Sequence, residues 1–294
     1  MTSSSPIIVL DSGLGGLTVV RALREAMPAE NVLYFGDTAR LPYGSKTAAT
    51  VTGFVRQIIE YLRAYDPKHV VIACNTATAL SLSAVRPMFP TLPISGVIEP
   101  GAKAAVIAAG AKMVPVIGII ATEATVRSKA YERAIAHRRH HARLLLRPTP
   151  LLVPIIEEGR RENDPLVRLA LRQYLTPMLK SGLDVLVLGC THYPILRKAI
   201  CEVVGKAVKV IDSAEQCAQD VARRLRARGL ARESDESDPS ARGTLRTFVT
   251  DDPLRFRNLA SRFLGVAIDP PTWVSPDELY AARPTEPERI SVPA

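Results

Sequence analysis

Short apolar runs alternate along the chain with longer stretches in which apolar residues recur at helical spacing. The first run is PIIVL at 6–10. After it, Leu17, Val20 and Leu23 are spaced as they would be on one face of a helix. Because the same order is repeated along most of the sequence, and strand–helix repeats are typical of a parallel sheet covered by helices, the pattern predicts an α/β protein.

The pattern also predicts where the individual elements lie. The predicted strands are 6–10, 31–36, 69–73, 114–120, 143–147, 184–189, 209–212 and 244–249. The predicted helices are 17–27, 47–65, 76–85, one beginning near Glu99, 125–136, 165–180, 213–230 and 253–264. We expect a loop at 232–243, where apolar periodicity is absent, and a loosely ordered, proline-rich tail after residue 269.

Two segments of the chain resemble each other. VVIACNTATA at 70–79 and VLVLGCTHYP at 185–194 each have an apolar run, a cysteine at its end, and Asn or Thr next. This match predicts two similar domains, each a mostly parallel sheet flanked by helices, with the active site in the cleft between them. The predicted division is 1–98 plus 212–268 for domain A, 99–211 for domain B, and 269–294 for the tail. A chance match among many strand–helix repeats is the alternative.

Composition is that of a globular protein large enough for two domains. The 294 residues are 47% hydrophobic and 23% charged, which excludes a disordered, collagen-like or coiled-coil chain. The four cysteines include no CxxC pair and no secretory leader precedes the first strand, so we expect a cytoplasmic protein. Lys112 and Pro115 interrupt the most apolar stretch, 104–121, so we expect no membrane span.

The net charge of +9 leaves two classes of partner open. Such a balance fits an enzyme that attracts anionic substrates, and it also fits a protein that binds nucleic acid or a DNA-processing enzyme such as a topoisomerase. The arginines between 223 and 262 motivate the second hypothesis, although ARRLRARGL at 222–230 is more typical of a solvated helix face. Aromatic residues are only 5%, and no stacking motif or zinc finger supports nucleic-acid binding.

Cys74 and Cys190 are the strongest candidates for chemistry. Each stands between a predicted strand and a polar helix start, where the helix N-terminus favours a thiolate. Because open α/β sheets bind ligands beyond the carboxyl ends of their strands, two such domains would place these thiols across one cleft. Cys201 and Cys217 fall within helical runs and are interpreted as small apolar residues.

The segment DSGLGG at 11–16 follows the first strand directly. It is not a dinucleotide-binding fingerprint, because Thr18 stands where the third glycine is needed. One interpretation is a turn whose backbone N–H groups hold a substrate carboxylate, with Asp11 close to the chemistry; the other is a purely structural turn. Asp37 is likewise open to two interpretations, attraction of a substrate ammonium group or a structural role in a loop.

The histidines offer one further candidate. His192 lies two residues after Cys190, where an imidazole can exchange a proton with a thiol. We expect no metal ion, because C-T-H lacks zinc-site spacing and no CxxC completes it. His137, His140 and His141 are expected to form a solvated basic end of a helix.

Several blocks of the sequence resemble the glutamate racemase family of the aspartate/glutamate racemase superfamily. They are DSGLGGLTV, YFGDTARLPYGSK, ACNTATA, GVIEPG, TEATVRSKAY, LLVPIIEEG, GCTHYPIL and VIDSA, in this order along the first three quarters of the chain. The chain departs from the family pattern at Ala121, at Thr149, and in its tail and basic charge.

The resemblance implies roles for residues that match the family motifs. Cys74 and Cys190 would be the two acid–base groups, with Asp11 assisting the first and His192 and Glu157 assisting the second. The residues that hold the substrate would be Asp11, Ser12, Tyr43, Gly44, Asn75, Thr76, Thr125, Thr191 and His192.

The resemblance also implies an activity. It is racemisation of L-glutamate to D-glutamate for peptidoglycan by two thiols, without a cofactor, in a cytoplasmic homodimer. A racemase acting on another acidic amino acid such as aspartate is the alternative enzyme.

Overall fold

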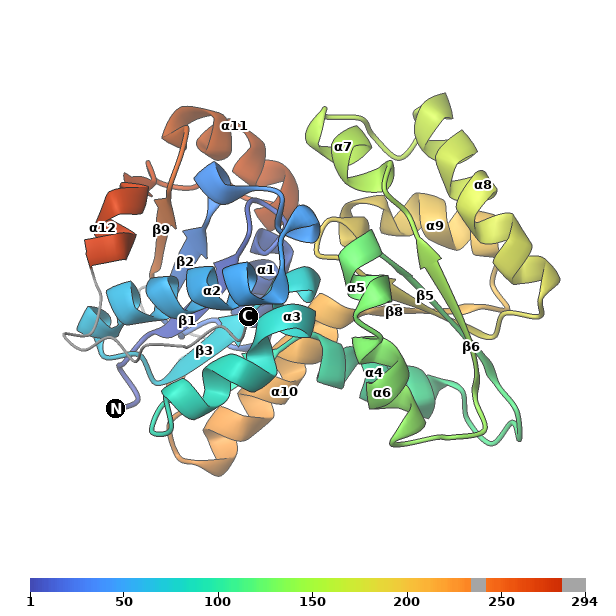
Figure 1. Cartoon of the computed structure of the whole chain (residues 1–294), viewed down its shortest axis with the longest axis horizontal. Helices are drawn as coiled ribbons and strands as arrows, with labels where there is room; N and C mark the ends of the chain where they lie inside the picture. The colour runs from blue at the N-terminus through green and yellow to red at the C-terminus, as the bar shows by residue number, and fades with distance from the viewer. Residues whose placement is uncertain (234–241, 282–294) are drawn as a thin grey trace, which may run out of the picture.

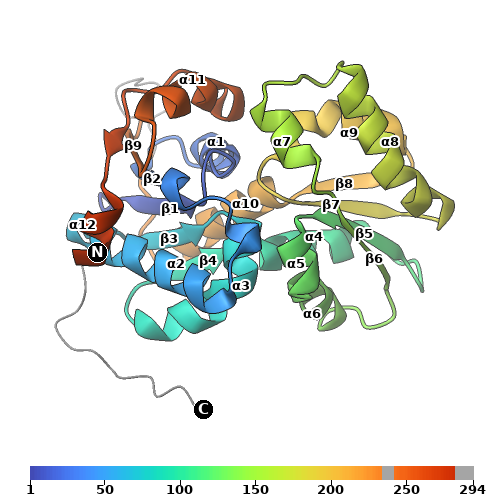
Figure 2. The same ribbon diagram turned by 45° about the horizontal axis from the view of Figure 1, so that its top comes forward.

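The structure is a computed structural model that describes residues 1–233 and 242–281. Its strands form two separate sheets, one of six strands and one of four, and every strand pairing is parallel. Figures 1 and 2 show the two sheets side by side, each with helices packed around it. The predicted α/β class with two parallel sheets is therefore confirmed.

The strands are β1 (Ile7–Asp11), β2 (Val32–Gly36), β3 (His69–Ile72), β4 (Ile94–Gly96), β5 (Val116–Ala121), β6 (Arg143–Pro148), β7 (Val185–Gly189), β8 (Lys209–Asp212), β9 (Leu245–Val249) and β10 (Thr272–Trp273). The α-helices are α1 (Leu17–Ala26), α2 (Ala48–Leu62), α3 (Asn75–Val85), α4 (Ile98–Ala108), α5 (Glu123–Arg127), α6 (Ala130–Ala136), α7 (Leu152–Glu157), α8 (Pro165–Lys180), α9 (Arg197–Val204), α10 (Ser213–Ala227), α11 (Pro253–Leu264) and α12 (Pro276–Ala281).

The larger sheet has the strand order β10-β9-β2-β1-β3-β4. All residues of β1, β2 and β3 are buried, as is expected of parallel strands with helices on both faces. Their side chains fill two apolar clusters, one on each face of the sheet: Ile7 and Val9 belong to one, and Ile8 and Leu10 to the other.

The smaller sheet has the order β6-β5-β7-β8. Its two inner strands, β5 and β7, are buried along their whole length. Strand β8 is followed by α10, which packs against α1 next to the larger sheet and against α4 next to the smaller one. Helix α10 therefore ties the two halves of the molecule together.

Both sheets place a cysteine at the same kind of position. In the larger sheet the chain order changes direction between β1 and β3, and Cys74 follows β3 by two residues. In the smaller sheet it changes direction between β5 and β7, and Cys190 directly follows β7. Such points open a crevice beyond the strand ends, which is where α/β proteins bind ligands. The two similar sequence segments thus occupy equivalent places.

The structure differs from the predicted elements in three respects. The helix predicted at 125–136 is two helices, because Lys129 adopts a left-handed φ of 56° between them. Three short elements, β4, α7 and α9, were not predicted. Part of the predicted tail is folded: β10 pairs with β9, and α12 packs against α2 with Leu279 fully buried. The rest of that tail, 282–294, and most of the predicted loop at 232–243 lie outside the described residues.

The larger sheet contains β1 to β4, β9 and β10, and the smaller sheet contains β5 to β8. The chain therefore passes from the larger sheet to the smaller one after β4 and returns after β8. The residue-by-residue domain boundaries stay a prediction. No helix in the described part of the chain has the length and apolar character needed to cross a membrane. The apolar stretch at 104–121 is divided between the end of α4, a turn and β5.

Candidate active site

Cys74 is the N-cap residue of α3 and is 7% exposed. Its Sγ atom accepts hydrogen bonds from the backbone N–H of Ala77 at 3.4 Å and from the Ser12 hydroxyl at 3.6 Å. Burial and the nearby Asp11 carboxylate raise the pKa of Cys74 to about 12, against the smaller opposing effect of these two donors. At neutral pH the free protein therefore holds Cys74 as a thiol.

Asp11 ends β1 and begins the glycine-rich turn. Its Oδ2 atom accepts from the backbone N–H of Gly13 at 3.0 Å, and the Tyr34 hydroxyl donates to the Gly13 carbonyl at 2.6 Å. Burial raises the pKa of Asp11, and the charge of His192 opposes that rise. The turn is thus tightly built, and it also carries an acidic group next to the thiol of Cys74.

The glycines of this turn allow the two halves of the molecule to approach closely. A Cβ atom on Gly15 would lie 2.5 Å from His192 Nδ1, so no other residue fits there without a shift. The Thr18 hydroxyl donates to the Thr191 carbonyl at 3.0 Å, which joins the start of α1 to the loop after β7. The turn after β1 therefore contacts both cysteine loops.

Cys190 is 6% exposed and has a different environment. Its Sγ atom lies 3.8 Å from His192 Nδ1, and His192 Nε2 lies 2.9 Å from Glu157 Oε1 at the end of α7. Burial alone would lower the pKa of His192, but the hydrogen bonds to Cys190 and Glu157 outweigh it and raise that pKa to about 10. A protonated imidazole next to Cys190 stabilises a thiolate there.

The two thiols are close enough for their charges to interact, since Cys190 is among the groups that raise the pKa of Cys74. Asp11 feels the charges of both His192 and Glu157. The structure thus brings together all five predicted catalytic residues. Two thiols at one site, one of them next to an imidazole, can donate and accept protons.

Polar residues from both halves surround the two cysteines. The Thr76 hydroxyl lies 2.9 Å from that of Thr122 and 3.2 Å from that of Thr125, so α3 and α5 meet through three hydroxyls. The Asn75 side chain accepts from the Tyr131 hydroxyl at 2.8 Å. The Thr191 side chain is buried beside Cys190.

Two buried polar atoms at this site have no hydrogen-bond partner among the described residues. They are Asp11 Oδ1 and Asn75 Nδ2. A buried polar atom without a partner costs free energy, so it points to a ligand that completes it. A carboxylate oxygen and an amide N–H together suit a ligand with both a cationic and an anionic group.

The loop after β2 holds Tyr43 and Gly44 next to α3 and α5. The Tyr43 hydroxyl donates to the Asp37 carboxylate, which is fully buried. Asp37 also accepts from Arg40 Nε at 2.7 Å and from the Thr250 hydroxyl at 3.0 Å. Of the two interpretations of Asp37, attraction of a substrate ammonium group and a structural role in a loop, these contacts support the structural one. Asp37 also fixes the orientation of Tyr43.

Three site residues were not predicted. Thr122 completes the hydroxyl cluster with Thr76 and Thr125, Tyr34 anchors the turn after β1, and the Tyr193 hydroxyl hydrogen-bonds to that of Thr149 next to Cys190. Only the two tyrosines could have been found from the sequence. Each lies in or next to an apolar run, and a buried tyrosine hydroxyl needs a polar partner. Thr149, a departure from the family pattern, thus has a defined contact.

Among the described residues, no hydrogen bond joins the other cysteines or histidines to the predicted site residues. Cys201 is exposed on α9 and Cys217 is buried in α10. His137, His140 and His141 are exposed, as expected of a solvated basic segment. Among residues 1–233 and 242–281, no three His, Cys, Asp or Glu side chains are grouped so as to hold a metal ion.

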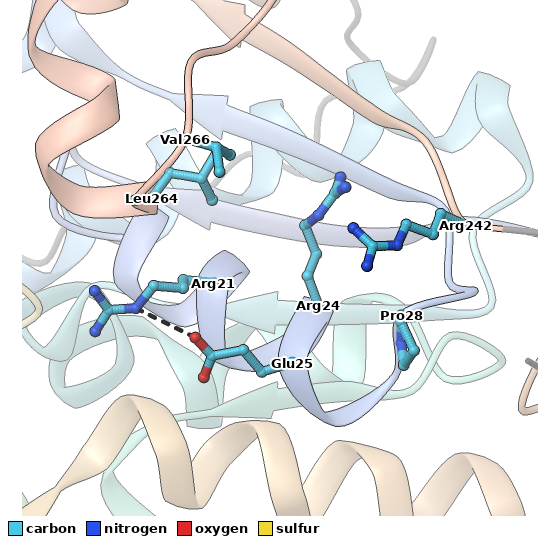
Figure 3. Close-up of a pocket in the computed structure, with 8 residues that line it drawn as sticks. Arg21, Arg24, Glu25, Pro28, Arg242, Leu264 and Val266 are labelled. Atoms are coloured by element: carbon cyan, nitrogen blue, oxygen red, sulfur yellow. Dashed lines mark ion pairs between the residues drawn. The ribbon is translucent and has the colours of Figure 1, made fainter. Parts of the chain in front are cut away.

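A cavity of about 510 Å³ lies elsewhere, beside α1 and the end of α11. Figure 3 shows Arg24 and Arg242 in its wall, and the charge of Arg242, together with burial, lowers the pKa of Arg24. None of the predicted site residues lines it. On α10, Arg223 and Arg224 pair with Asp220, and their side chains are exposed, which fits a solvated helix face.

The chain is similar to proteins of known activity. The family model described as Asp/Glu/Hydantoin racemase matches residues 13–221. The glutamate racemase of Neisseria meningitidis serogroup A is 44% identical over 270 residues, which are 92% of this chain and 96% of that protein.

Solved structures give the same result. The glutamate racemase of Thermus thermophilus, in complex with β-chloro-D-alanine, has a TM-score of 0.81 and 42% identity, with 95% of this chain and 100% of that one covered. The glutamate racemase of Francisella tularensis, in complex with D-glutamate, has a TM-score of 0.83 and 33% identity, with 93% and 98% covered.

Proposed function

The chain belongs to the Asp/Glu/hydantoin racemase family, and from this premise we propose that it interconverts L- and D-glutamate by proton transfer at two cysteines. The observation that carries the proposal is the placement of Cys74 and Cys190 at equivalent strand ends of two sheets, with interacting charges. Because the chain is similar to glutamate racemases, we propose glutamate rather than aspartate as its substrate.

Inversion at the α-carbon requires that a proton leave one face and another arrive on the opposite face. Two monoprotic groups on opposite sides meet this requirement, if one is deprotonated and the other protonated. In the free protein Cys190, beside the His192 imidazolium, is the base, and the Cys74 thiol is the acid. One turnover exchanges these states. They are restored when Cys190 loses its proton to solvent and Cys74 takes one up from solvent, or when the other enantiomer reacts in the reverse direction.

The groups around the thiols suit glutamate. The unpartnered Asp11 Oδ1 accepts from the substrate ammonium, and the unpartnered Asn75 Nδ2 donates to a carboxylate. Further hydrogen bonds come from the remaining predicted substrate-binding residues, which are Ser12, Tyr43, Gly44, Thr76, Thr125, Thr191 and His192.

Hydrogen bonding must also stabilise the carbanion that forms when the α-proton leaves. A substrate carboxylate bound by several donors at a buried site accepts the developing charge without an added cofactor. The side chains of Asn75, Thr76 and Thr191 are all buried, so their hydrogen bonds act in surroundings of low polarity.

The proposal extends to the cellular setting. D-glutamate made in this way supplies peptidoglycan, and the reaction belongs in a reducing cytoplasm because both thiols must stay free. All four cysteines are free in the structure, which supports this location. We further propose a homodimer, which light scattering of the purified protein tests directly.

The test of the proposed activity is a stereospecific assay on glutamate and aspartate without added cofactor. We expect racemisation of glutamate, and we expect Cys74→Ala and Cys190→Ala each to lower kcat/KM by at least roughly 100-fold. Cys201→Ala, on the exposed face of α9, is the matched control and should retain full activity. Full activity in either of the first two variants would remove the two-thiol mechanism, and preference for aspartate would change the substrate.

A further inference from the structure

Helix α11 packs against α1 in the half of the larger sheet, but the side chain of Arg262, near its C-terminal end, reaches the α7 segment in the other half. Figures 1 and 2 both show α11 beside α7. Arg262 makes the contact: Nη1 donates to the Ile156 carbonyl at 2.9 Å, and Nη2 donates to the Arg160 carbonyl at 2.9 Å. The guanidinium therefore spans the segment that follows α7.

Glu157 lies within the segment that this guanidinium holds. Ile156 directly precedes it, and Arg160 follows three residues later. The Glu157 carboxylate is in turn hydrogen-bonded to His192, and His192 to Cys190. A continuous series of contacts thus leads from Arg262 to the sulfur of Cys190.

We propose that Arg262 is a positioning residue for racemisation, which fixes Glu157 against His192 by holding the two carbonyl groups on either side of it. This inference rests on the proposed function. Arg262 does not contact the reacting atoms; it acts through Glu157.

The chemistry of Arg262 supports this role. In the part of the chain that the structure describes, no carboxylate forms an ion pair with its guanidinium, so its charge-assisted hydrogen bonds go to backbone carbonyls. A basic side chain at the C-terminal end of a helix is favourable because the last carbonyls have no partner within the helix. The planar fork of arginine presents a separate nitrogen to each carbonyl in a fixed geometry, whereas lysine has a single nitrogen on a flexible stem.

The neighbouring residues of α11 act on the same pair. The ring of Phe263 packs edge-on against the His192 ring, with centroids 5.3 Å apart. Arg255, in the first turn of α11, contributes a positive charge that helps His192 to lower the pKa of Glu157. One helix thus holds the histidine by Phe263 and its carboxylate partner by Arg262.

This arrangement makes the Cys190 side dependent on contact between the two halves. The segment between β5 and β8, in the half of the smaller sheet, contains Glu157, Cys190 and His192. Helix α11 follows β9, a strand of the larger sheet. Correct placement of the carboxylate therefore requires that the halves be packed together.

The test compares Arg262→Gln and Arg262→Lys with Arg257→Gln. Arg257 is exposed on the same helix and makes no side-chain hydrogen bond within the described residues, so it is the matched control. We expect kcat/KM to fall about 10- to 100-fold in Arg262→Gln, to fall less in Arg262→Lys, and to stay unchanged in Arg257→Gln. The fall must be equal in both directions, because the two enantiomers of glutamate have the same free energy.

Two further readouts separate positioning from general damage to the fold. His192 faces Cys190, Glu157 and Asp11, so weaker contact with Glu157 lowers its pKa and moves the alkaline limb of kcat/KM to lower pH. The α-deuterium isotope effect should rise for the enantiomer whose proton Cys190 removes, since that step becomes slower, and should not rise for the other. A variant that merely contains less folded protein shows neither change.

The outcomes are distinguishable from failure of the proposed function. If the wild-type protein does not racemise glutamate, the proposed function fails. If it does, unchanged kcat/KM in Arg262→Gln contradicts the positioning role. Reduced activity with the wild-type pH profile and isotope effects contradicts it as well, and thermal melting shows whether the fold is then the cause.

Discussion

The surroundings of Cys74 and Cys190 differ in charge although the two residues occupy equivalent positions. Cys74 accepts from two neutral donors, Ser12 and the N–H of Ala77, and lies near a carboxylate that disfavours its thiolate. Cys190 lies next to the imidazole of His192, which the Glu157 carboxylate helps to keep protonated. The first environment disfavours a thiolate, whereas the second places a cation next to the sulfur.

This difference shows how one architecture, present twice, provides an acid and a base. Strand β1, beside β3, ends in Asp11, whereas β5, the corresponding neighbour of β7, ends in Ala121 and places no carboxylate at that point. Two residues after the cysteine the larger sheet has Thr76 and the smaller has His192. A few side chains at the strand ends thus give the two sulfur atoms opposite electrostatic surroundings in similar backbones.

Removing the imidazole of His192 is expected to have the largest effect, because it abolishes the main difference between the two cysteine environments. His192→Asn deletes the cation that stabilises a thiolate at Cys190, and we expect kcat/KM for glutamate to fall roughly 100-fold or more at pH 7.5. The same assay on folded protein, verified by circular dichroism, measures the effect. A loss of less than threefold would mean that Cys190 does not need His192.

Lowering the pKa of His192 without removing its side chain is expected to have the second largest effect. Glu157→Gln removes a charge that raises the pKa of His192 to about 10, so this pKa falls toward its ordinary value of about 6.5. The imidazolium is then lost at lower pH, and the alkaline limb of kcat/KM shifts in that direction, with a roughly tenfold loss at neutral pH. The profile of kcat/KM against pH checks this, and an unshifted alkaline limb would contradict it.

The smallest effect is expected on the Cys74 side. Ser12→Ala removes a neutral hydroxyl that donates to the sulfur and, in the proposed function, also binds the substrate. A neutral hydrogen bond is worth about 1 kcal/mol, so we expect a loss of roughly fivefold in kcat/KM. The alkaline limb assigned to His192 should stay in place, which separates this variant from Glu157→Gln. A loss as large as that of His192→Asn would show that the Cys74 environment depends on Ser12 more than its neutral hydrogen bond implies.

The sequence predicted the repeated strand–helix order and both cysteines because these depend on local periodicity and on residues next to strand ends. It did not predict β4, which has only three residues, or the break at Lys129 inside a continuous helical pattern. Short elements and left-handed residues leave little periodic signal. The proline-rich composition of the tail concealed β10 and α12 for a similar reason.

Contacts between distant residues were the least accessible part of the site. Glu157 lies 35 residues from His192, and only the resemblance to racemases paired them. The roles of Asp37 and Thr122 depend on partners from other elements, and Arg262 lies 106 residues from Ile156. Such pairs are set by tertiary packing, which no local pattern encodes.

The most direct test of the two-thiol account is the fate of the α-proton in deuterated water. L-glutamate is incubated with the protein and sampled by mass spectrometry at low conversion. We predict that the D-glutamate formed carries deuterium at its α-carbon while the remaining L-glutamate keeps its proton, because separate groups remove and deliver protons on opposite faces. D-glutamate that retains the original proton, or equally rapid labelling of both enantiomers, would show that a single base serves both faces.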